Sequence, residues 1–331
     1  MKKLSSKGVI ILCIALVLIA VASLIFDKND THPVKFGVTF TPKYARDLKL
    51  DWQKTYTQIL DNLHVRNLRL SSFWDIIELE RGQFNFAETD YLLSEAGKRG
   101  ARAILVVGAR QPRWPECHVP AWAKNLPADQ KQKETLILVQ KVIERYKDEG
   151  SVWAWQVENE PLLTVFGEGC DFIDKNFLKR ELELVRSISK KPIIMTDSGE
   201  LGFWITSMQM SDIFGTTVYR KVYDKWLGYV TYPVPPSFYS IKSNLVRSLF
   251  AKNNQKTIIV ELQTEPWLAN GDFAVPEEQA RIFTTQDFKN YVNFSQNTGF
   301  DEVYLWGVEW WYYMASHGHP EYLDFARTLF K

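Results

Sequence analysis

The chain of 331 residues carries 40 basic and 39 acidic residues, so its charge is balanced. Nucleic-acid-binding proteins usually present a basic stripe, and the even balance leads us to expect no nucleic-acid partner. Aromatic residues are abundant, with 12 Trp, 14 Tyr and 20 Phe. Such rings can fill a large core, or they can form flat platforms for the C–H-rich faces of sugars.

Residues 1–30 are predicted to be a membrane anchor or a signal segment. Three lysines precede an uncharged, mostly apolar run over residues 8–26, which is long enough to span a bilayer. Because the lysines come first, we expect the N-terminus to stay in the cytoplasm and the rest to be exported. A signal peptide cleaved near Ala20-Val21-Ala22 is the alternative, and its product would be secreted. We favour an uncleaved anchor that contacts the lipid bilayer through residues 8–26, because apolar residues continue beyond the small ones.

The remaining chain alternates short apolar runs with longer helical patterns, which is typical of parallel βαβ units. Strands are expected at residues 34–40, 65–70, 103–107, 152–157, 192–195, 213–218, 257–260 and 303–306. Helices are expected at about 51–63, 87–98, 129–147, 172–189, 202–210, up to 251, 277–296 and 321–329.

This alternation predicts an α/β fold: a single closed (β/α)₈ TIM barrel over residues 34–331, with no second domain. A doubly wound open sheet is the alternative. It usually has fewer strands, and no GxGxxG fingerprint opens a helix in this chain.

Two glutamates follow predicted strands, Glu160 after the fourth and Glu261 after the seventh. Barrel enzymes carry their chemistry at these strand ends. A pair of carboxylates can cleave a glycosidic bond, because one protonates the leaving oxygen while the other attacks the sugar or activates water. Glu265, in the following loop, is the nearest rival to Glu261. We interpret Glu158 as a buried structural partner rather than a third catalytic acid.

A family resemblance accompanies this pair. Asn159-Glu160-Pro161, together with Glu261 and with Arg69 on the second strand, resembles the motif set of clan A glycoside hydrolases, which include cellulase-like and β-galactosidase-like families. The segment from Trp74 to Phe86 is similar to a stretch in the β-galactosidase-like members. The resemblance covers about residues 35–315 and implies a retaining O-glycosyl hydrolase without a cofactor or metal.

The resemblance also implies residue roles. Glu160 would be the acid/base and Glu261 the nucleophile, with Arg69 holding Glu261 ionised and Asn159 bonding the sugar 2-hydroxyl. The expected substrate-binding residues are Arg69, Asn159, Tyr219, Trp306, Trp114 and His118.

Two cysteines lie in the part expected to be exported. Cys117 and Cys170 fall in the loops after the third and fourth strands, which are neighbours in a barrel. We expect them to form a disulfide in an oxidising compartment.

The leading hypothesis is a glycosidase, anchored in the membrane or secreted, that acts on a β-linked oligo- or polysaccharide. A barrel that binds polysaccharide at the cell surface without cleaving it is the alternative. The sugar and the choice between endo and exo action depend on the loops 111–127 and 219–236.

Overall fold

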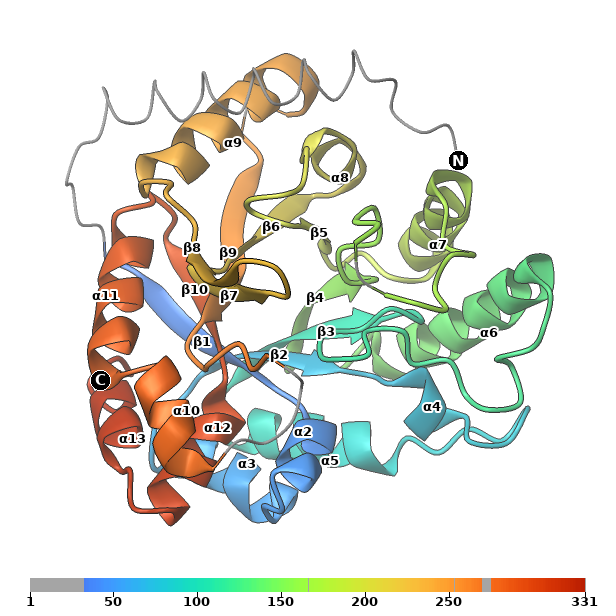
Figure 1. Ribbon diagram of the computed structural model, residues 1–331. Helices are drawn as coiled ribbons and strands as arrows, with labels where there is room; N and C mark the ends of the chain where they lie inside the picture. Colours follow the sequence, from blue (N-terminus) through green and yellow to red (C-terminus); the bar gives the residue numbers. More distant parts are fainter. Residues whose placement is uncertain (1–32, 166, 253, 270–274, 331) are drawn as a thin grey trace.

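The computed structural model describes residues 33–165, 167–252, 254–269 and 275–330. Eight parallel strands close into a barrel in the order β1-β10-β9-β6-β5-β4-β3-β2 (Figure 1). The predicted closed barrel is therefore confirmed, and the open sheet is wrong. The barrel strands are β1 (Lys35–Phe40), β2 (Asn67–Ser71), β3 (Arg102–Val107), β4 (Val152–Val157), β5 (Ile193–Asp197), β6 (Ile213–Val218), β9 (Lys256–Gln263) and β10 (Glu302–Trp306).

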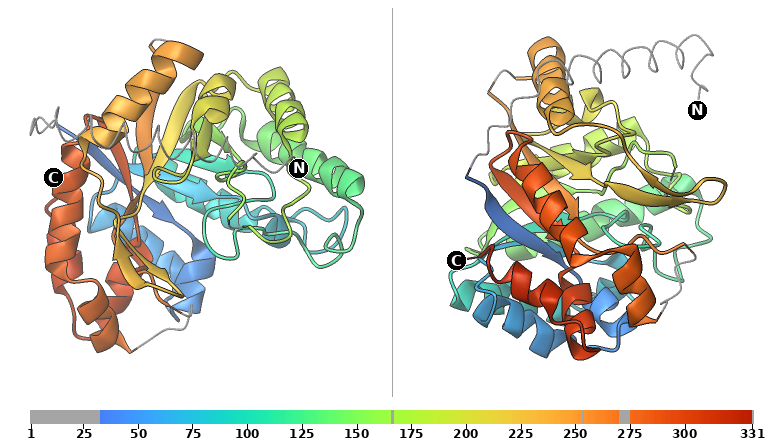
Figure 2. Two further views of the ribbon diagram at one scale, coloured as in Figure 1. Left: turned by 45° about the horizontal axis from the view of Figure 1, so that its top comes forward. Right: turned by 60° about the vertical axis from the view of Figure 1, so that its left-hand side comes forward.

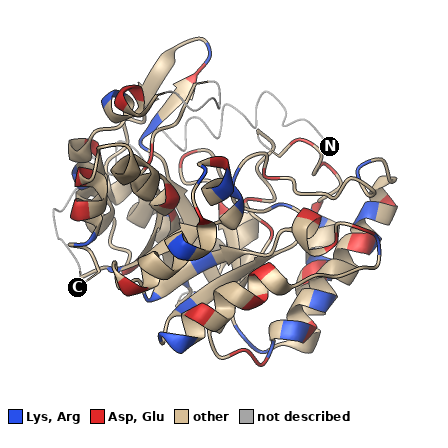
Figure 3. Cartoon of the chain, turned by 90° about the horizontal axis from the view of Figure 1, so that it is seen from below, with Lys and Arg blue, Asp and Glu red and all other residues tan. Residues whose placement is uncertain are grey.

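Helices surround the barrel and cover the outer faces of its strands (Figures 1 and 2). Three of them begin where the sequence supplies a cap, since the side chains of Asp51, Asp174 and Thr284 accept hydrogen bonds from backbone N–H groups of the first turn. The helices are α2 (Pro42–Asp47), α3 (Trp52–Asp61), α4 (Trp74–Ile77), α5 (Ala87–Lys98), α6 (Ala128–Tyr146), α7 (Lys175–Ile188), α8 (Ile205–Met210), α9 (Ser237–Phe250), α10 (Pro276–Ile282), α11 (Thr285–Gln296), α12 (Val308–Ser316) and α13 (Glu321–Ala326). Figure 3 shows Lys and Arg interspersed with Asp and Glu on the helices of one face.

The core has two parts. A large apolar layer fills the space between the strands and the helices and includes the buried Trp310 and Trp311. A small apolar cluster fills the inside of the barrel, and its members are Ile104, Ala154, Ile194, Ile258, Val260 and Tyr304. Side chains of a strand alternate between two faces, so Gln156 lies on the same inner face as Ala154, one layer nearer the carboxyl end. Polar inner residues thus begin where the apolar cluster ends.

The structure departs from the strict alternation of eight strands and eight helices. The predicted helix 277–296 is two helices, because Thr284 and Asp287 form a capping box that starts α11 afresh. The helix α12 was not predicted, and its all-round apolar sequence lacks the amphipathic pattern that would have indicated it. The loop after β6 contains an antiparallel hairpin of β7 (Lys221–Asp224) and β8 (Gly228–Thr231).

The expected membrane segment over residues 8–26 lies outside the described residues. Among the residues that the structure describes, none of the helices has the length and apolar character needed to cross a bilayer.

Candidate active site

The two predicted carboxylates meet at the carboxyl end of the barrel. Glu160 follows β4 and Glu261 lies near the end of β9, and both are buried. Thr217 of β6 connects them, because its hydroxyl donates to Glu160 Oε1 at 3.2 Å while its Cα is the register partner of Glu261. The fold therefore brings together two glutamates that are 101 positions apart in the sequence.

A β-bulge aims Glu261 into the barrel. The pairing of β6 with β9 runs from Thr216 opposite Ile259 to Thr217 opposite Glu261, so Val260 is the extra residue. Val260 belongs to the inner apolar cluster, and regular alternation would turn the next side chain outward. A bulge shifts that alternation by one residue, so Glu261 faces the same side as Val260.

Arg69 organises the floor of the site. Its Nη1 donates to Glu261 Oε1 at 2.7 Å, its Nη2 to Asn159 Oδ1 at 2.7 Å, and its Nε to Gln156 Oε1 at 2.8 Å. The guanidinium is fully buried, and a buried charge needs such complete pairing to be tolerated. The hydroxyl of Tyr219 donates to the other oxygen of Glu261 at 2.8 Å. Both oxygens of Glu261 therefore accept a hydrogen bond.

Glu160 has a different environment. Burial raises its pKa well above the ordinary range, and the charges of Glu261, Glu116 and Asp197 raise it further, against the opposing charge of Arg110. A raised pKa keeps a carboxyl protonated near neutral pH, which a general acid requires. The two carboxyl groups therefore have different environments. Glu261 accepts hydrogen bonds from Arg69 and Tyr219, whereas Glu160 is buried near other negative charges.

The backbone around Glu160 is unusual. Glu158 and Glu160 both adopt positive φ angles, of 56° and 43°, which non-glycine residues seldom do. The amide of Glu160 donates to Thr196 Oγ1 at 2.8 Å, which fixes this turn to β5. Left-handed residues of this kind cluster at functional sites.

Glu158 has a set of partners of its own. It is fully buried and accepts hydrogen bonds from the backbone N–H groups of Ala109 and Arg110 in the loop after β3. Burial raises the pKa of Glu158 to about 7 and raises that of its neighbour Glu181 on α7 well above the ordinary value. This placement agrees with a structural rather than a catalytic role.

Arg113 covers a face of Trp306. Its guanidinium lies 4.1 Å from the centroid of the Trp306 ring and 3.7 Å from that of Tyr44. It forms ion pairs with Glu265 and with Glu309. The loop after β3 therefore reaches across to the ends of β9 and β10. Glu265, the rival to Glu261, is engaged by this arginine instead.

His118 and Trp114, two of the expected substrate-binding residues, differ in burial. His118 is buried, and its Nδ1 lies 3.0 Å from Lys43 Nζ while its Nε2 lies 3.2 Å from the Arg113 carbonyl oxygen. Trp114 is 77% exposed. The structure shows no contact of either side chain with Glu160 or Glu261.

The sequence interpretation missed several residues of the site. Gln156 could have been found, because it is a polar residue at an inward position of an otherwise apolar strand. Glu116 and Arg110 lie in the loop after β3, where both guanidinium Nε and Nη2 donate to Glu116 Oε2 at 2.9 and 2.6 Å. Arg110 and Glu116 come together only because the loop folds back on itself, and no local sequence pattern indicates this pair.

Cys117 and Cys170 are joined in a disulfide, with their Cα atoms 5.5 Å apart. The bond ties the loop after β3 to the loop after β4. The loop that carries Arg110, Arg113 and Glu116 is therefore attached at its end to the loop that follows Glu160.

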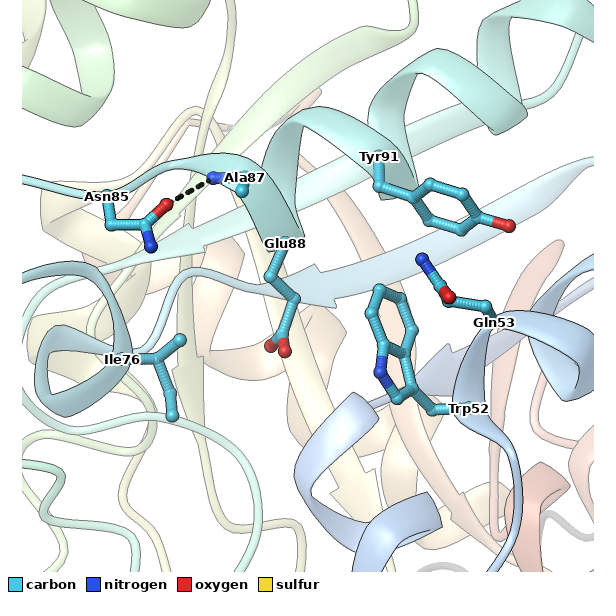
Figure 4. Close-up of a pocket in the computed structure, with 7 residues that line it drawn as sticks. All are labelled: Trp52, Gln53, Ile76, Asn85, Ala87, Glu88 and Tyr91. Carbon is cyan, nitrogen blue, oxygen red and sulfur yellow. Dashed lines mark hydrogen bonds between the residues drawn. The ribbon is translucent and has the colours of Figure 1, made fainter.

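A cavity of about 350 Å³ lies outside the barrel, between α3, α4 and α5 (Figure 4). Trp52, Tyr91 and Glu88 are among its lining residues, and none of the predicted site residues is. In the described part of the chain, no group of three or more His, Cys, Asp or Glu could hold a metal ion.

The closed barrel carries glutamates at the ends of its fourth and seventh strands, which is the arrangement that the resemblance to clan A implies. Comparisons with known proteins confirm the resemblance. The model of glycoside hydrolase family 42, described as β-galactosidase, matches residues 46–191. This segment includes Glu160 and Arg69 but ends before Glu261.

Curated proteins match over shorter stretches. β-Galactosidase Bga of Halorubrum lacusprofundi is 26% identical over 145 residues, which are 38% of this chain and 20% of that protein. Endo-1,4-β-xylanase 2 of Claviceps purpurea is 38% identical over 92 residues, which are 26% of this chain and 25% of that protein. The chain thus spans a fifth to a quarter of the length of these relatives.

Solved structures share the fold. A GH5_18 variant from Bifidobacterium longum in complex with Manβ1-4GlcNAc superposes with a TM-score of 0.58 at 13% identity, covering 82% of this chain and 68% of that one. At this identity the likeness concerns the barrel alone.

Proposed function

We propose that the protein is a retaining glycoside hydrolase that cleaves a β-linked oligo- or polysaccharide. The observation that carries the proposal is the contrast within the buried pair. Glu261 accepts hydrogen bonds from Arg69 and Tyr219, whereas the pKa of Glu160 is raised by burial and by the negative charge of Glu261. One carboxyl is therefore suited to attack and the other to donate a proton.

The proposed reaction has two displacements. In the first, Glu160 gives its proton to the glycosidic oxygen while a Glu261 oxygen forms a bond to the anomeric carbon, and the leaving group departs as an alcohol. In the second, the Glu160 carboxylate takes a proton from water, the water oxygen bonds to the anomeric carbon, and the bond to Glu261 breaks. Two inversions at one carbon give net retention.

Asn159 is proposed to bind the sugar. Its Oδ1 accepts from Arg69 Nη2 and from Gln156 Nε2, at 2.7 and 3.2 Å. These bonds orient the amide so that its nitrogen is the group free to donate to a sugar hydroxyl. A donor to the 2-hydroxyl gains strength in the transition state.

The names of the relatives support the substrate class. They include β-galactosidases, a β-1,4-xylanase and a barrel bound to Manβ1-4GlcNAc. We therefore propose a β-linked pyranoside as substrate, with β-galactosides as the first compounds to assay.

A panel of aryl β-glycosides tests the proposal. Glu261→Ala should lower kcat/KM at least about 1,000-fold, since the nucleophile is lost. Glu265→Gln is the matched control and should keep hydrolysis within about tenfold, because Glu265 pairs with Arg113. Unchanged hydrolysis by Glu261→Ala would refute the assignment. A wild-type chain that binds polysaccharide but cleaves no glycoside would favour the non-catalytic alternative.

We further propose an extracytoplasmic barrel, anchored through residues 8–26 or released by cleavage. The Cys117–Cys170 disulfide supports an oxidising compartment. Cell fractionation followed by mass spectrometry of the N-terminus tests both forms, and recovery of the barrel with free thiols from the cytosol would contradict the proposal.

A further inference from the structure

The tip of the β7–β8 hairpin exposes two large apolar side chains. Trp226 is 82% exposed and Leu227 is 77% exposed. Large apolar residues at such exposure forgo the stabilisation of burial, which makes the tip a candidate binding surface. The ammonium of Lys225 lies 5.4 Å from the centroid of the Trp226 ring.

The tip is rigid. The side chain of Asp224 accepts hydrogen bonds from the backbone N–H groups of Trp226 and Leu227, at 2.8 and 3.0 Å. Gly228 closes the turn with a φ of 73°, and Tyr223 packs edge-to-face against Tyr229 across the two strands at 5.3 Å. An aromatic ring on a pre-formed turn loses little conformational entropy when it binds a ligand.

The base of the hairpin is fixed to the strand that carries Glu261. The side chain of Gln263, which is buried, accepts from the backbone N–H groups of Arg220 and Lys221 and donates to the Lys221 carbonyl, at 2.9, 2.9 and 2.7 Å. Tyr219, immediately before this base, donates to Glu261. The hairpin is therefore continuous with the candidate active site.

The hairpin stands on the catalytic side of the barrel. It follows β6 directly, so it begins at the carboxyl ends of the strands. The right-hand view of Figure 2 shows it projecting beyond the rest of the fold. A glycan chain that leaves the site on this side would meet the tip at a distance from the bond being cleaved.

We propose that Trp226 is a stacking platform for a distant sugar unit of a β-linked glycan chain, so that the enzyme favours long substrates. The inference rests on the proposed function and adds chain-length preference to it. An indole face suits the C–H-rich face of a pyranose. A lipid surface is the other partner that an exposed Trp-Leu tip fits, and the fixed link between the hairpin and β9 favours the glycan.

Kinetics on two kinds of substrate test the platform in the full chain. Trp226→Ala should lower kcat/KM about tenfold on β-1,4-linked hexasaccharides of the accepted sugar, consistent with the loss of one aromatic stacking contact. It should leave kcat/KM on the aryl monosaccharide glycoside unchanged, because that substrate is too short to reach the tip. Trp226→Phe should restore most of the hexasaccharide activity.

Phe250→Ala is the matched control, since Phe250 is also an exposed aromatic, at 46%, but lies at the end of α9 on the opposite side of the barrel. It should change neither activity. Equal losses on both substrates with Trp226→Ala, or no loss on the hexasaccharide, would overturn the proposal. A loss of binding to anionic phospholipid vesicles with unchanged hexasaccharide kinetics would also overturn it, in favour of a lipid surface.

Calorimetric titration of the hexasaccharides separates this proposal from the proposed function. If the wild-type chain hydrolyses no glycoside, the proposed function fails, yet a tenfold weaker affinity of Trp226→Ala would still support the platform. Equal affinities of the two proteins would contradict it.

Discussion

Arg69 links the groups on which the proposed chemistry depends. Its three nitrogens donate to Glu261, Asn159 and Gln156, so one guanidinium sets the positions of the proposed nucleophile and of the proposed 2-hydroxyl donor. Because Arg69 is fully buried, its positive charge is not screened by water and acts strongly on Glu261. A lysine at this position could not bind all three partners in the same geometry, since its ammonium group lacks the planar, forked arrangement of N–H donors of a guanidinium.

The buried pair of Glu158 and Glu181 makes stability depend on pH. The folded-state pKa of Glu158 is raised to about 7, from about 4.3 in an unfolded chain. A raised carboxyl pKa gives stability that is fully present below the unfolded value and is lost as pH rises through the folded value. The protein should therefore lose on the order of 3 kcal/mol between about pH 4.5 and pH 8 from this group.

Glu181→Gln tests this dependence. Glu181 lies beside Glu158 and interacts with it, and an amide at this position removes the titrating group while keeping N–H donors for Glu158. We expect the variant to gain in Tm relative to the wild type as pH rises from 5 to 8. Glu183→Gln, at an exposed position of the same helix, is the control. Parallel Tm profiles for all three proteins would contradict the expectation.

At the residue scale, the sequence predicted where the candidate site residues lie along the strands better than it predicted which side chains contact one another. Glu160 and Glu261 could be singled out because strand ends can be read from apolar runs and because Glu160 lies in an Asn-Glu-Pro motif. The expectation that Trp306 binds substrate remains a prediction, and the guanidinium of Arg113 covers one face of its ring. Arg113 lies 193 positions before Trp306, and no sequence pattern predicts a cation–π contact between residues so far apart.

At the element scale, the loop after β3 determines the shape of the site. The loop carries Arg110 and Glu116, whose charges act on Glu160. It also carries Arg113, which contacts Trp306 at the end of β10. The disulfide between Cys117 and Cys170 and the hydrogen bonds to Glu158 hold it in place. This loop borders the site after β3, and the β7–β8 hairpin borders it after β6.

Removing the disulfide should destabilise the fold. Changing both Cys117 and Cys170 to serine should lower the free energy of unfolding by about 2–4 kcal/mol, because the bond closes a long loop between cysteines that are 53 positions apart. Denaturant unfolding with and without a reductant measures the effect. The reductant should weaken the wild type and leave the double variant unchanged. Identical midpoints for the oxidised wild type and the double variant would contradict this prediction.

Element types were predictable where the local pattern agreed with the tertiary environment. The fourth and sixth strands were predicted with the bounds that the structure shows, since their apolar runs are compact and bordered by turns. The hairpin was taken for a loop because its strands are only four residues long and half exposed. Helix α12 was not predicted because its largely apolar sequence lacks the periodicity of an amphipathic helix.

At the scale of the whole molecule, barrel closure assembles the site. β4 and β9 are separated by β5 and β6 in the sheet, and their carboxyl ends open on the same side. The family match ends at residue 191, so the sequence relationship covers Glu160 while the place of Glu261 rests on the fold. The role of Glu261 is therefore the central claim to test.

Covalent labelling tests that claim most directly. An activated 2-deoxy-2-fluoro β-glycoside of the accepted sugar should slow the second displacement and leave the sugar attached to the enzyme. Glu261 and Glu265 lie in one tryptic peptide, so fragmentation in a mass spectrometer must locate the sugar. We predict the added mass on Glu261 and none in Glu261→Ala. A label on Glu265, or inactivation without any attached sugar, would contradict the account.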